Sequence, residues 1–173
     1  KAQQYLESHK PVLSARTYVI EAGRAWYEIW VPHDPAAWAA PKLVFPDIAE
    51  KPIFWLDTEG SVVSGECYWL QCKHSANTDL LWLALAIANS TFIEKFYDYR
   101  FNNKLYAGRR RFITQYVEHF PLPNPELDAS KAIIQLAKRI YAVLPSAQAA
   151  ALIEALNLKV WNIFGLTPEK ITR

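Results

Sequence analysis

Glycine is scarce in this sequence, with five among 173 residues. Phosphate-binding loops of the Rossmann and Walker types need several glycines at fixed spacing, so neither is present. The Gly-x-Ser-x-Gly turn of acyl-transferring hydrolases is missing too. So is the aromatic-flanked Asn-Pro-Pro signature of amino-methylating enzymes, for which Asn124-Pro125-Glu126 is no substitute. We therefore expect no catalytic site and no cofactor in this chain.

Cysteine and histidine are also few. Cys67 and Cys72 are the two cysteines, and their spacing within one strand would direct them to opposite faces, so we expect no disulfide. The four histidines are scattered, and no Cys/His set has the spacing of a zinc site. These features favour a reducing, cytoplasmic setting.

Methionine is absent altogether, and the chain starts at Lys1. We therefore expect a fragment or a processed product of a longer protein. No signal peptide is visible, and the longest apolar run, residues 80–88, is about half of the ~20 residues needed to span a bilayer. With 51% hydrophobic and 14% aromatic residues, the chain can fill a core, and we expect a soluble protein with no membrane partner.

The first 73 residues predict mainly β-structure. A short helix should end before Pro11. The alternation in residues 26–31 predicts a strand with one buried face, and Pro46 should end another strand because proline cannot donate to a central ladder. Prolines mark a loop near His33 and Trp38, and Ser64-Gly65 is a possible bulge. The predicted strands are residues 18–20, 26–31, 43–45, 53–56, 62–63 and 67–70, with turns at 21–24 and 57–60.

The pattern becomes helical after Asn77-Thr78-Asp79, which can cap a helix. Residues 80–88 are apolar all round and should be buried, and the helix should become amphipathic from Phe92. Residues 112–120 fit a strand or a short helix. Two more helices should cover residues 128–144 and the segment between Ser146 and Gly165, followed by a turn at residues 167–169.

These elements predict an α+β fold, with a small, mainly antiparallel sheet, a buried helix packed on it, and a C-terminal helical segment. We expect a domain over residues 1–125, and a helical segment over residues 126–173 that packs on it or on a partner domain.

Residues 95–111 are strongly basic. The stretch has one carboxylate, Asp98, whereas the remaining chain has 13 bases and 16 carboxylates, and the formal net charge is +2. A stretch of positive charge attracts polyanions. A solvated helix end and loop with no binding role would have the same composition. Guanidinium and amide groups can pair with phosphates or base edges. The six bases are Lys95, Arg100, Lys104, Arg109, Arg110 and Arg111.

Several short segments of this sequence follow one another in the order seen in a known family. They are Trp26-Tyr27-Glu28, Pro41-Lys42-Leu43-Val44-Phe45-Pro46-Asp47-Ile48, Ala88-Asn89-Ser90, Gly108-Arg109-Arg110-Arg111-Phe112, Phe120-Pro121-Leu122-Pro123, and residues 158–167. In this order the chain resembles the TaqI-like C-terminal specificity domain. That domain is the target-recognition part of adenine-N6 DNA methyltransferases and of fused type IIG restriction–modification enzymes. Leu122 and Thr91 depart from the usual isoleucine and basic residue.

The resemblance implies that the chain recognises duplex DNA for a restriction–modification methyltransferase. It also implies a separate N-terminal methyltransferase domain as a partner, which would hold S-adenosylmethionine. We expect phosphate contacts from Lys42, Lys51, Lys73 and Lys104. Candidates for base edges are Arg100, Asn102, Asn103, Arg109, Arg110, Arg111 and Gln115. Tyr106 and Trp38 would pack on sugars or support a distorted groove.

Other interpretations stay open. At least one residue of the triple arginine should pair with a carboxylate, and Asn89 and Ser90 fit hydrogen bonding in the core. Trp26, Trp55, Trp69 and Trp82 are expected in the core. The two C-terminal helices could instead dock a separate methyltransferase chain, as in a specificity subunit. A metal-dependent nuclease built around Asp47 is the other alternative, although no Glu-x-Lys or Asp-x-Lys follows Pro46-Asp47 at a suitable distance.

Overall fold

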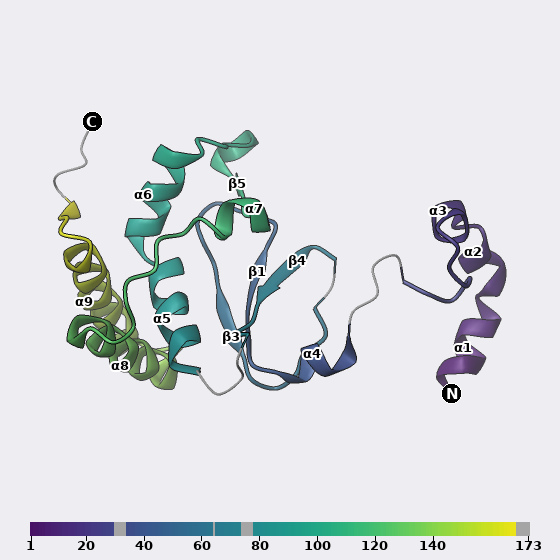
Figure 1. Ribbon diagram of the computed structural model, residues 1–173, viewed down its shortest axis with the longest axis horizontal. Coiled ribbons are helices and arrows are strands. Elements are labelled where there is room, and N and C mark those ends of the chain that lie inside the picture. The colour runs from purple at the N-terminus through teal and green to yellow at the C-terminus, as the bar shows by residue number, and fades with distance from the viewer. Residues whose placement is uncertain (30–33, 64, 74–77, 169–173) are drawn as a thin grey trace. The chain divides into compact units, whose positions relative to one another are not determined.

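The computed structural model describes residues 1–29, 34–63, 65–73 and 78–168. The chain forms two compact units, Lys1–Ala37 and Trp38–Arg173 (Figure 1). Residues on both sides of position 125 belong to the larger unit, and a functional division at that position stays a prediction. No helix within the described ranges has both the length and the apolar character needed to cross a membrane.

The N-terminal unit is helical. Helix α1 is Ala2–Ser8 and α2 is Lys10–Ser14, so the predicted short helix before Pro11 is confirmed, and Pro11 lies in the first turn of the next helix. Helix α3, Thr17–Glu21, occupies the place of the strand predicted at residues 18–20, which is therefore wrong. The β-content predicted for the first 73 residues begins only at residue 42.

The strand predicted at residues 26–31 is also wrong where the chain is described. Residues 26–28 form a turn and a bend, and Trp30 and Val31 lie outside the described residues. The Arg16 guanidinium donates to the carbonyl oxygens of Trp26, at 2.6 Å, and Glu28, at 3.1 Å. The Glu28 carboxylate accepts from the backbone N–H of Ala25 at 2.7 Å. Nearby side chains thus satisfy backbone groups that a strand would offer to a neighbouring strand.

The main sheet has three antiparallel strands. Strand β1, Lys42–Pro46, lies between β3, Trp55–Asp57, and β4, Cys67–Leu70. Its Leu43, Val44 and Phe45 are all buried, and Pro46 is its last residue, as predicted. Strands β2, Ile48–Ala49, and β5, Arg110–Arg111, form a second antiparallel pair.

The connections in the sheet are partly as expected. The predicted turn after β3 is confirmed, because the Asp57 carboxylate accepts from the N–H groups of Glu59 and Ser61. Gly60 has a φ of 77° there, which favours glycine. Residues 62–63 are not a strand, and the bulge expected at Ser64 falls outside the described residues. The prolines from Pro35 onward enclose helix α4, Pro35–Ala39, whereas Pro32 and His33 are not described.

The helix predicted from residue 78 is two helices. Helix α5, Thr78–Ala88, is largely buried, as expected, while Asn77 of the expected cap is not described. Helix α6, Thr91–Arg100, starts anew, because the Ser90 hydroxyl accepts from the backbone N–H of Ile93 at 3.3 Å. After α6 come the 3₁₀ turn η1, Tyr106–Gly108, strand β5, and the short helix α7, Thr114–Val117.

The two C-terminal helices are confirmed as α8, Asp128–Val143, and α9, Ala147–Ile163. Ser146 stands at the N-cap of α9 but makes no capping hydrogen bond. Gly165 ends α9 with a φ of 70°, while the Leu166 N–H donates to the Trp161 carbonyl. This is the Schellman motif, in which backbone N–H groups beyond the helix pair with its last carbonyl oxygens.

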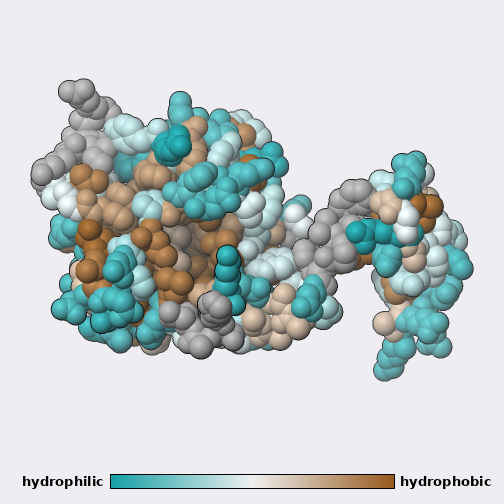
Figure 2. All heavy atoms as spheres, viewed as in Figure 1, coloured by the Kyte–Doolittle hydropathy of each residue, from teal (hydrophilic) through white to brown (hydrophobic). Residues whose placement is uncertain are grey.

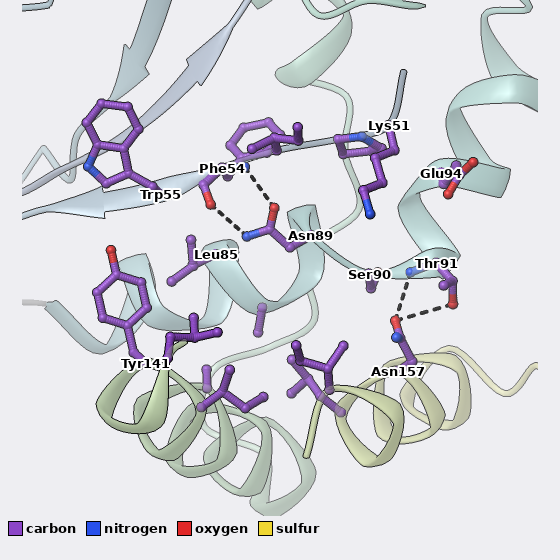
Figure 3. A pocket seen from close by; sticks show the side chains of 18 residues that line it. Lys51, Phe54, Trp55, Leu85, Asn89, Ser90, Thr91, Glu94, Tyr141 and Asn157 are labelled. Atoms are coloured by element: carbon purple, nitrogen blue, oxygen red, sulfur yellow. Dashed lines mark hydrogen bonds between the residues drawn. The ribbon is translucent and has the colours of Figure 1, made fainter. Parts of the chain in front are cut away.

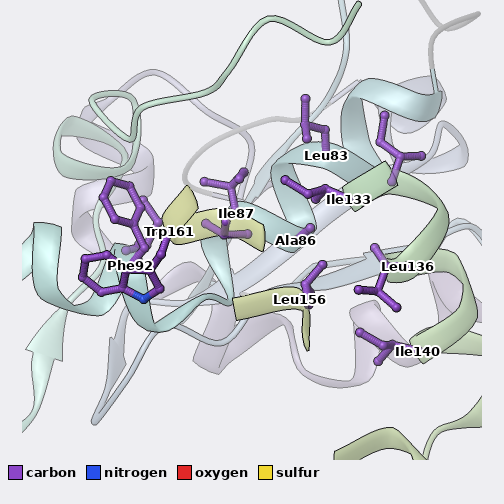
Figure 4. Packing of buried hydrophobic residues seen from close by; sticks show 13 residues of the cluster. Leu83, Ala86, Ile87, Phe92, Ile133, Leu136, Ile140, Leu156 and Trp161 are labelled. Carbon is purple, nitrogen blue, oxygen red and sulfur yellow. The ribbon is translucent and has the colours of Figure 1, made fainter. Parts of the chain in front are cut away.

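Helices α8 and α9 pack on α5 (Figures 1 and 4). Leu83 and Ile87 of α5 meet Ile133 of α8 and Trp161 of α9 in one hydrophobic cluster. Trp161 is 2% exposed and lies in this cluster, against which Trp82 also packs. Of the tryptophans expected in the core, Trp55 is 47% exposed, contrary to the prediction, and Trp26, Trp69 and Trp82 are partly buried.

Together these elements form an α+β fold, which confirms the predicted class. Cys67 and Cys72 do not form a disulfide with each other.

Candidate nucleic-acid interface

The second half of the basic stretch forms a closed loop, residues 104–110, which we call the tip loop. Lys104 pairs with Arg110 in an antiparallel bridge, and the Leu105 N–H donates to the Arg109 carbonyl at 2.7 Å. At the turn, Ala107 and Gly108 have φ of 55° and 72°. Tyr106 is 75% exposed, and the Arg109 guanidinium lies over its ring, 5.5 Å from the centroid.

Arg110, in contrast, points inward at the base of this loop. Its side chain is 8% exposed and makes a two-pronged contact with Asp98, with Nε–Oδ1 at 2.6 Å and Nη2–Oδ2 at 2.8 Å. Nη2 also contacts Glu94 Oε1 at 3.2 Å, and Nη1 donates to the Glu50 carbonyl. The hydrogen bond from Arg110 lowers the pKa of Asp98, and the same bond raises the pKa of Arg110.

Arg111 lies on the outer face and pairs with Asp47. Its Nε and Nη2 reach the two carboxylate oxygens at 3.1 and 3.2 Å, and its side chain remains 51% exposed. The Tyr97 hydroxyl donates to the Arg111 carbonyl at 2.6 Å, and burial raises the pKa of Tyr97 to about 12. The expectation that the triple arginine includes a carboxylate pair is confirmed for both Arg110 and Arg111.

The other predicted residues of this stretch surround the tip loop in the sequence. Arg100 is exposed, with its guanidinium 5.6 Å from the Phe101 ring centroid. Asn102 is exposed with a φ of 47°, whereas the Asn103 amide donates to the Tyr116 hydroxyl at 2.9 Å. Gln115 is exposed on α7. Figure 2 shows hydrophilic residues gathered over the end of the domain where α6, β5 and α7 lie.

Two predicted phosphate contacts outside the stretch are exposed. Lys51 follows Glu50, the residue whose carbonyl binds Arg110, so the backbone places it beside the base of the tip loop. Lys73 is exposed beyond the end of β4, and its following residues lie outside the described ranges. Trp38 is partly buried at the end of α4.

Two of the predicted DNA-contact residues, Lys42 and Arg110, have buried side chains, which argues against direct contact with a duplex. Lys42 is fully buried, with Nζ 2.5 Å from Asp57 Oδ2 and 2.6 Å from the Trp38 carbonyl. Burial raises the pKa of Asp57, but the hydrogen bond and charge of Lys42 and the N–H groups of Glu59 and Ser61 together outweigh it, so the pKa lies below its ordinary value. Arg110 is the second, since its donors are taken up inside the domain. Sequence alone did not distinguish these inward bases, because each carboxylate partner lies more than ten residues away.

A second feature, an apolar groove, was not anticipated from the sequence. This hollow of about 870 Å³ lies between the segment that leads into β3 and helices α5, α8 and α9. Figure 2 shows hydrophobic residues, in brown, gathered between the C-terminal helices and the sheet. Exposed members of the lining are Ile53, Trp55, Tyr141, Leu144 and Ile153.

Polar side chains in the groove serve the fold. The Asn89 amide accepts from the Phe54 N–H at 2.7 Å and donates to the Phe54 carbonyl at 2.8 Å (Figure 3). Asn157 accepts from the Thr91 N–H, and the Tyr141 hydroxyl donates to the Leu56 carbonyl. The expectation of hydrogen bonding in the core is confirmed for Ser90, which is buried and hydrogen-bonded to the Ile87 carbonyl, whereas Asn89 makes its hydrogen bonds from an exposed position.

Within the part of the chain that the structure describes, no three His, Cys, Asp or Glu residues are grouped so as to hold a metal ion. Asp47, the centre of the nuclease alternative, uses its carboxylate to bind Arg111 and its carbonyl to accept from the Phe112 N–H at 2.6 Å. Nothing in this arrangement favours the nuclease alternative.

Comparison with known proteins decides the family. Residues 2–122 match the TaqI-like C-terminal specificity domain. The chain belongs to that family. It is also 47% identical, over 139 residues, to the type II methyltransferase M.BanIII of Aneurinibacillus aneurinilyticus. That match covers 80% of this chain and 24% of the relative, so the chain spans about a quarter of the methyltransferase's length.

The limits of the family match bear on the site. In this TaqI-like specificity domain the matched segment includes the sheet, the tip loop and α7, whereas α8 and α9 lie beyond its end at residue 122. Every predicted DNA-contact residue falls inside it. The interface residues therefore belong to the part that the family shares.

Proposed function

We propose that this chain is the duplex-DNA recognition module of an adenine-N6 methyltransferase in a type II restriction–modification system. The observation that carries the proposal is the group of exposed cations within residues 95–111, in a chain of the specificity-domain family. Their charges exceed those of the three carboxylates that contact the stretch, Glu94, Asp98 and Asp47. The exposed cations are Lys95, Arg100, Lys104, Arg109 and Arg111.

The chain itself would bind the DNA backbone and recognise the base sequence. Lysine and arginine side chains neutralise phosphates and release counterions, which supplies most of the sequence-independent affinity. Arg109, pre-oriented on the Tyr106 ring, presents a planar fork that suits a base edge or a phosphate. Base methylation requires extrusion of the target base, and a separate methyltransferase part holding S-adenosylmethionine would receive it.

The proposal is tested by duplex binding at several salt concentrations. Four to five neutralised phosphates predict a slope of roughly −4 in log affinity against log salt. Titration of the 173-residue chain with a fluorescent mixed-sequence duplex between about 0.05 and 0.3 M salt measures that slope. A slope near zero, or no binding at the lowest salt, contradicts the proposal.

The apolar groove favours a second role, docking of the methyltransferase part. Because the relative M.BanIII is about four times as long as the matched segment, most of that protein lies outside the region that this chain resembles. Exposed apolar side chains gathered in one hollow are the usual mark of an interaction surface. We propose that the methyltransferase part of the parent protein covers this groove.

Charged substitutions in the groove test the docking proposal separately from DNA binding. Leu144→Glu with Ile153→Glu places two charges where the partner would bury apolar surface, so we expect at least tenfold weaker association with the separately produced methyltransferase part. The matched control, Leu158→Glu, changes an exposed leucine of α9 that does not line the groove. Unchanged association, or an equal loss in the control, would count against docking here.

A further inference from the structure

The contacts of Asp98 join the two ends of the tip loop. Its carboxylate holds Arg110 at 2.6 and 2.8 Å and also lies 3.3 Å from Lys104 Nζ, at the opposite end of the loop. Lys104 and Arg110 are in turn paired through the backbone bridge. The Asp98 carboxylate on α6 therefore holds both ends of the tip loop, whose exposed residues include Tyr106 and Arg109. We call this set of contacts the clamp.

Arg110 extends this clamp to a third segment. Four of its five N–H donors are engaged, by Asp98, Glu94 and the carbonyl that follows β2. Glu94 and Asp98 are four residues apart on α6 and so lie on one face of that helix. The planar guanidinium makes these contacts in one orientation only, which a flexible ammonium group does not impose.

The orientation of Arg110 sets that of its neighbours. The backbone is extended at Arg109, with φ −69° and ψ 157°, and β5 continues it. Side chains alternate along an extended chain, so an inward Arg110 directs Arg109 and Arg111 outward. The measured exposures agree, since Arg110 is buried while both flanking arginines are exposed.

We propose that Arg110 is a positioning residue for DNA recognition, which acts through the tip loop and fixes Arg109 toward the duplex without touching DNA itself. This inference rests on the proposed function. Lys104 is the exchangeable member of the clamp. Its side chain is 51% exposed, and when it leaves for a phosphate, Asp98 keeps its two bonds to Arg110.

A charge-balanced double variant tests the inference. Asp98→Asn with Arg110→Gln removes one charge of each sign, so the net charge and all exposed cations are kept and electrostatics alone predicts unchanged affinity. If Arg110 positions the tip loop, the double variant should lose at least tenfold in duplex affinity at about 0.1 M salt. The loop would then be disordered in the free protein, and ordering it on binding costs free energy. The matched control, Asp79→Asn with Lys138→Gln, removes an exposed ion pair elsewhere and should bind like the unmodified chain.

A double-mutant cycle with Arg109→Gln distinguishes positioning from general stability. In the unmodified chain this change should cost about tenfold, one phosphate contact at 0.1 M salt. In the Asp98→Asn, Arg110→Gln background it should cost less than about twofold, because the side chain is no longer held in place. Thermal melting of each variant verifies that it is folded at the assay temperature.

Arg110→Lys is the second variant, because it keeps a cation beside Asp98 and leaves no buried charge alone. We expect a smaller loss of affinity and a reduced effect of Arg109→Gln in this background too. Equal effects of Arg109→Gln in all folded backgrounds, or full affinity in both Arg110 variants, would overturn the inference. If the unmodified chain itself does not bind duplex DNA, the proposed function fails, and the inference with it.

Discussion

Replacing Lys42 with methionine is expected to lower the free energy of unfolding by about 3–5 kcal/mol. Lys42 and Asp57 are both buried and 2.5 Å apart, in adjacent strands of the main sheet. Methionine fills a similar volume, so the loss comes chiefly from Asp57, which would remain ionised and buried without its cation. Urea denaturation at pH 7, followed by tryptophan fluorescence, measures the difference.

The pH dependence of this loss identifies its cause. Burial raises the pKa of Asp57, but Lys42, together with the N–H groups of Glu59 and Ser61, brings it below the ordinary value of 3.8. The pair therefore stabilises the fold above that pH, and its contribution is lost as pH falls through the lowered pKa. In the variant, a protonated Asp57 is the cheaper form to bury. The difference in stability should therefore shrink as pH falls from 7 toward 4.

Two control variants test whether the loss of stability comes from the unpaired Asp57 carboxylate. Lys159→Met, at an exposed position of α9, should change stability by less than about 0.5 kcal/mol. Lys42→Met with Asp57→Asn should recover much of the loss, because no lone charge remains. A deficit that is equal at pH 4 and pH 7, and that the second change does not relieve, would assign it to packing instead.

Neutralising three exposed bases at the tip loop is expected to abolish most of the affinity for DNA. Lys104→Gln, Arg109→Gln and Arg111→Gln together remove three cations, each worth about 0.9 in the salt slope, so the slope should fall from roughly −4 to about −1. At 0.1 M salt this corresponds to a loss of roughly 10²–10³-fold. Fluorescence anisotropy with the same mixed-sequence duplex measures both quantities.

The matched control removes equal charge from the C-terminal helices. Lys131→Gln, Arg139→Gln and Lys159→Gln change three exposed bases of α8 and α9 and leave the tip loop intact. We expect less than a threefold change in affinity and a slope within about 0.5 of the unmodified value. Equal losses in the two variants would mean that only the net charge matters, and that the tip loop is not the interface.

The elements that sequence predicted well are those whose pattern is set locally. The helices at residues 128–143 and 147–163 follow apolar spacing and end at a proline or glycine signal. Strand β1 was found because three apolar residues precede Pro46. In each of these elements the residues that decide the outcome lie within one or two turns of it, so a single sequence suffices.

Two of the failures have a different cause, which is contact at long range. The alternation in residues 26–31 looked like a strand, but Arg16, ten residues earlier, binds the Trp26 carbonyl. The break between α5 and α6 was missed for a local reason, because the polar residues from Asn89 to Thr91 were included in one helix although Ser90 is a typical N-cap residue. For the candidate site, sequence located the basic stretch but not which of its bases face inward, since that depends on carboxylates of α6.

Helix α8 also protects the sheet. Strand β3 is an edge strand, and the Tyr141 hydroxyl of α8 occupies its Leu56 carbonyl. Unprotected edges invite pairing between molecules, and loss of α8 and α9 would also bare the apolar surface of α5. Exchange of this TaqI-like specificity domain between members of its family should therefore transplant residues 126–168 along with the family segment, because a shorter graft would be prone to self-association.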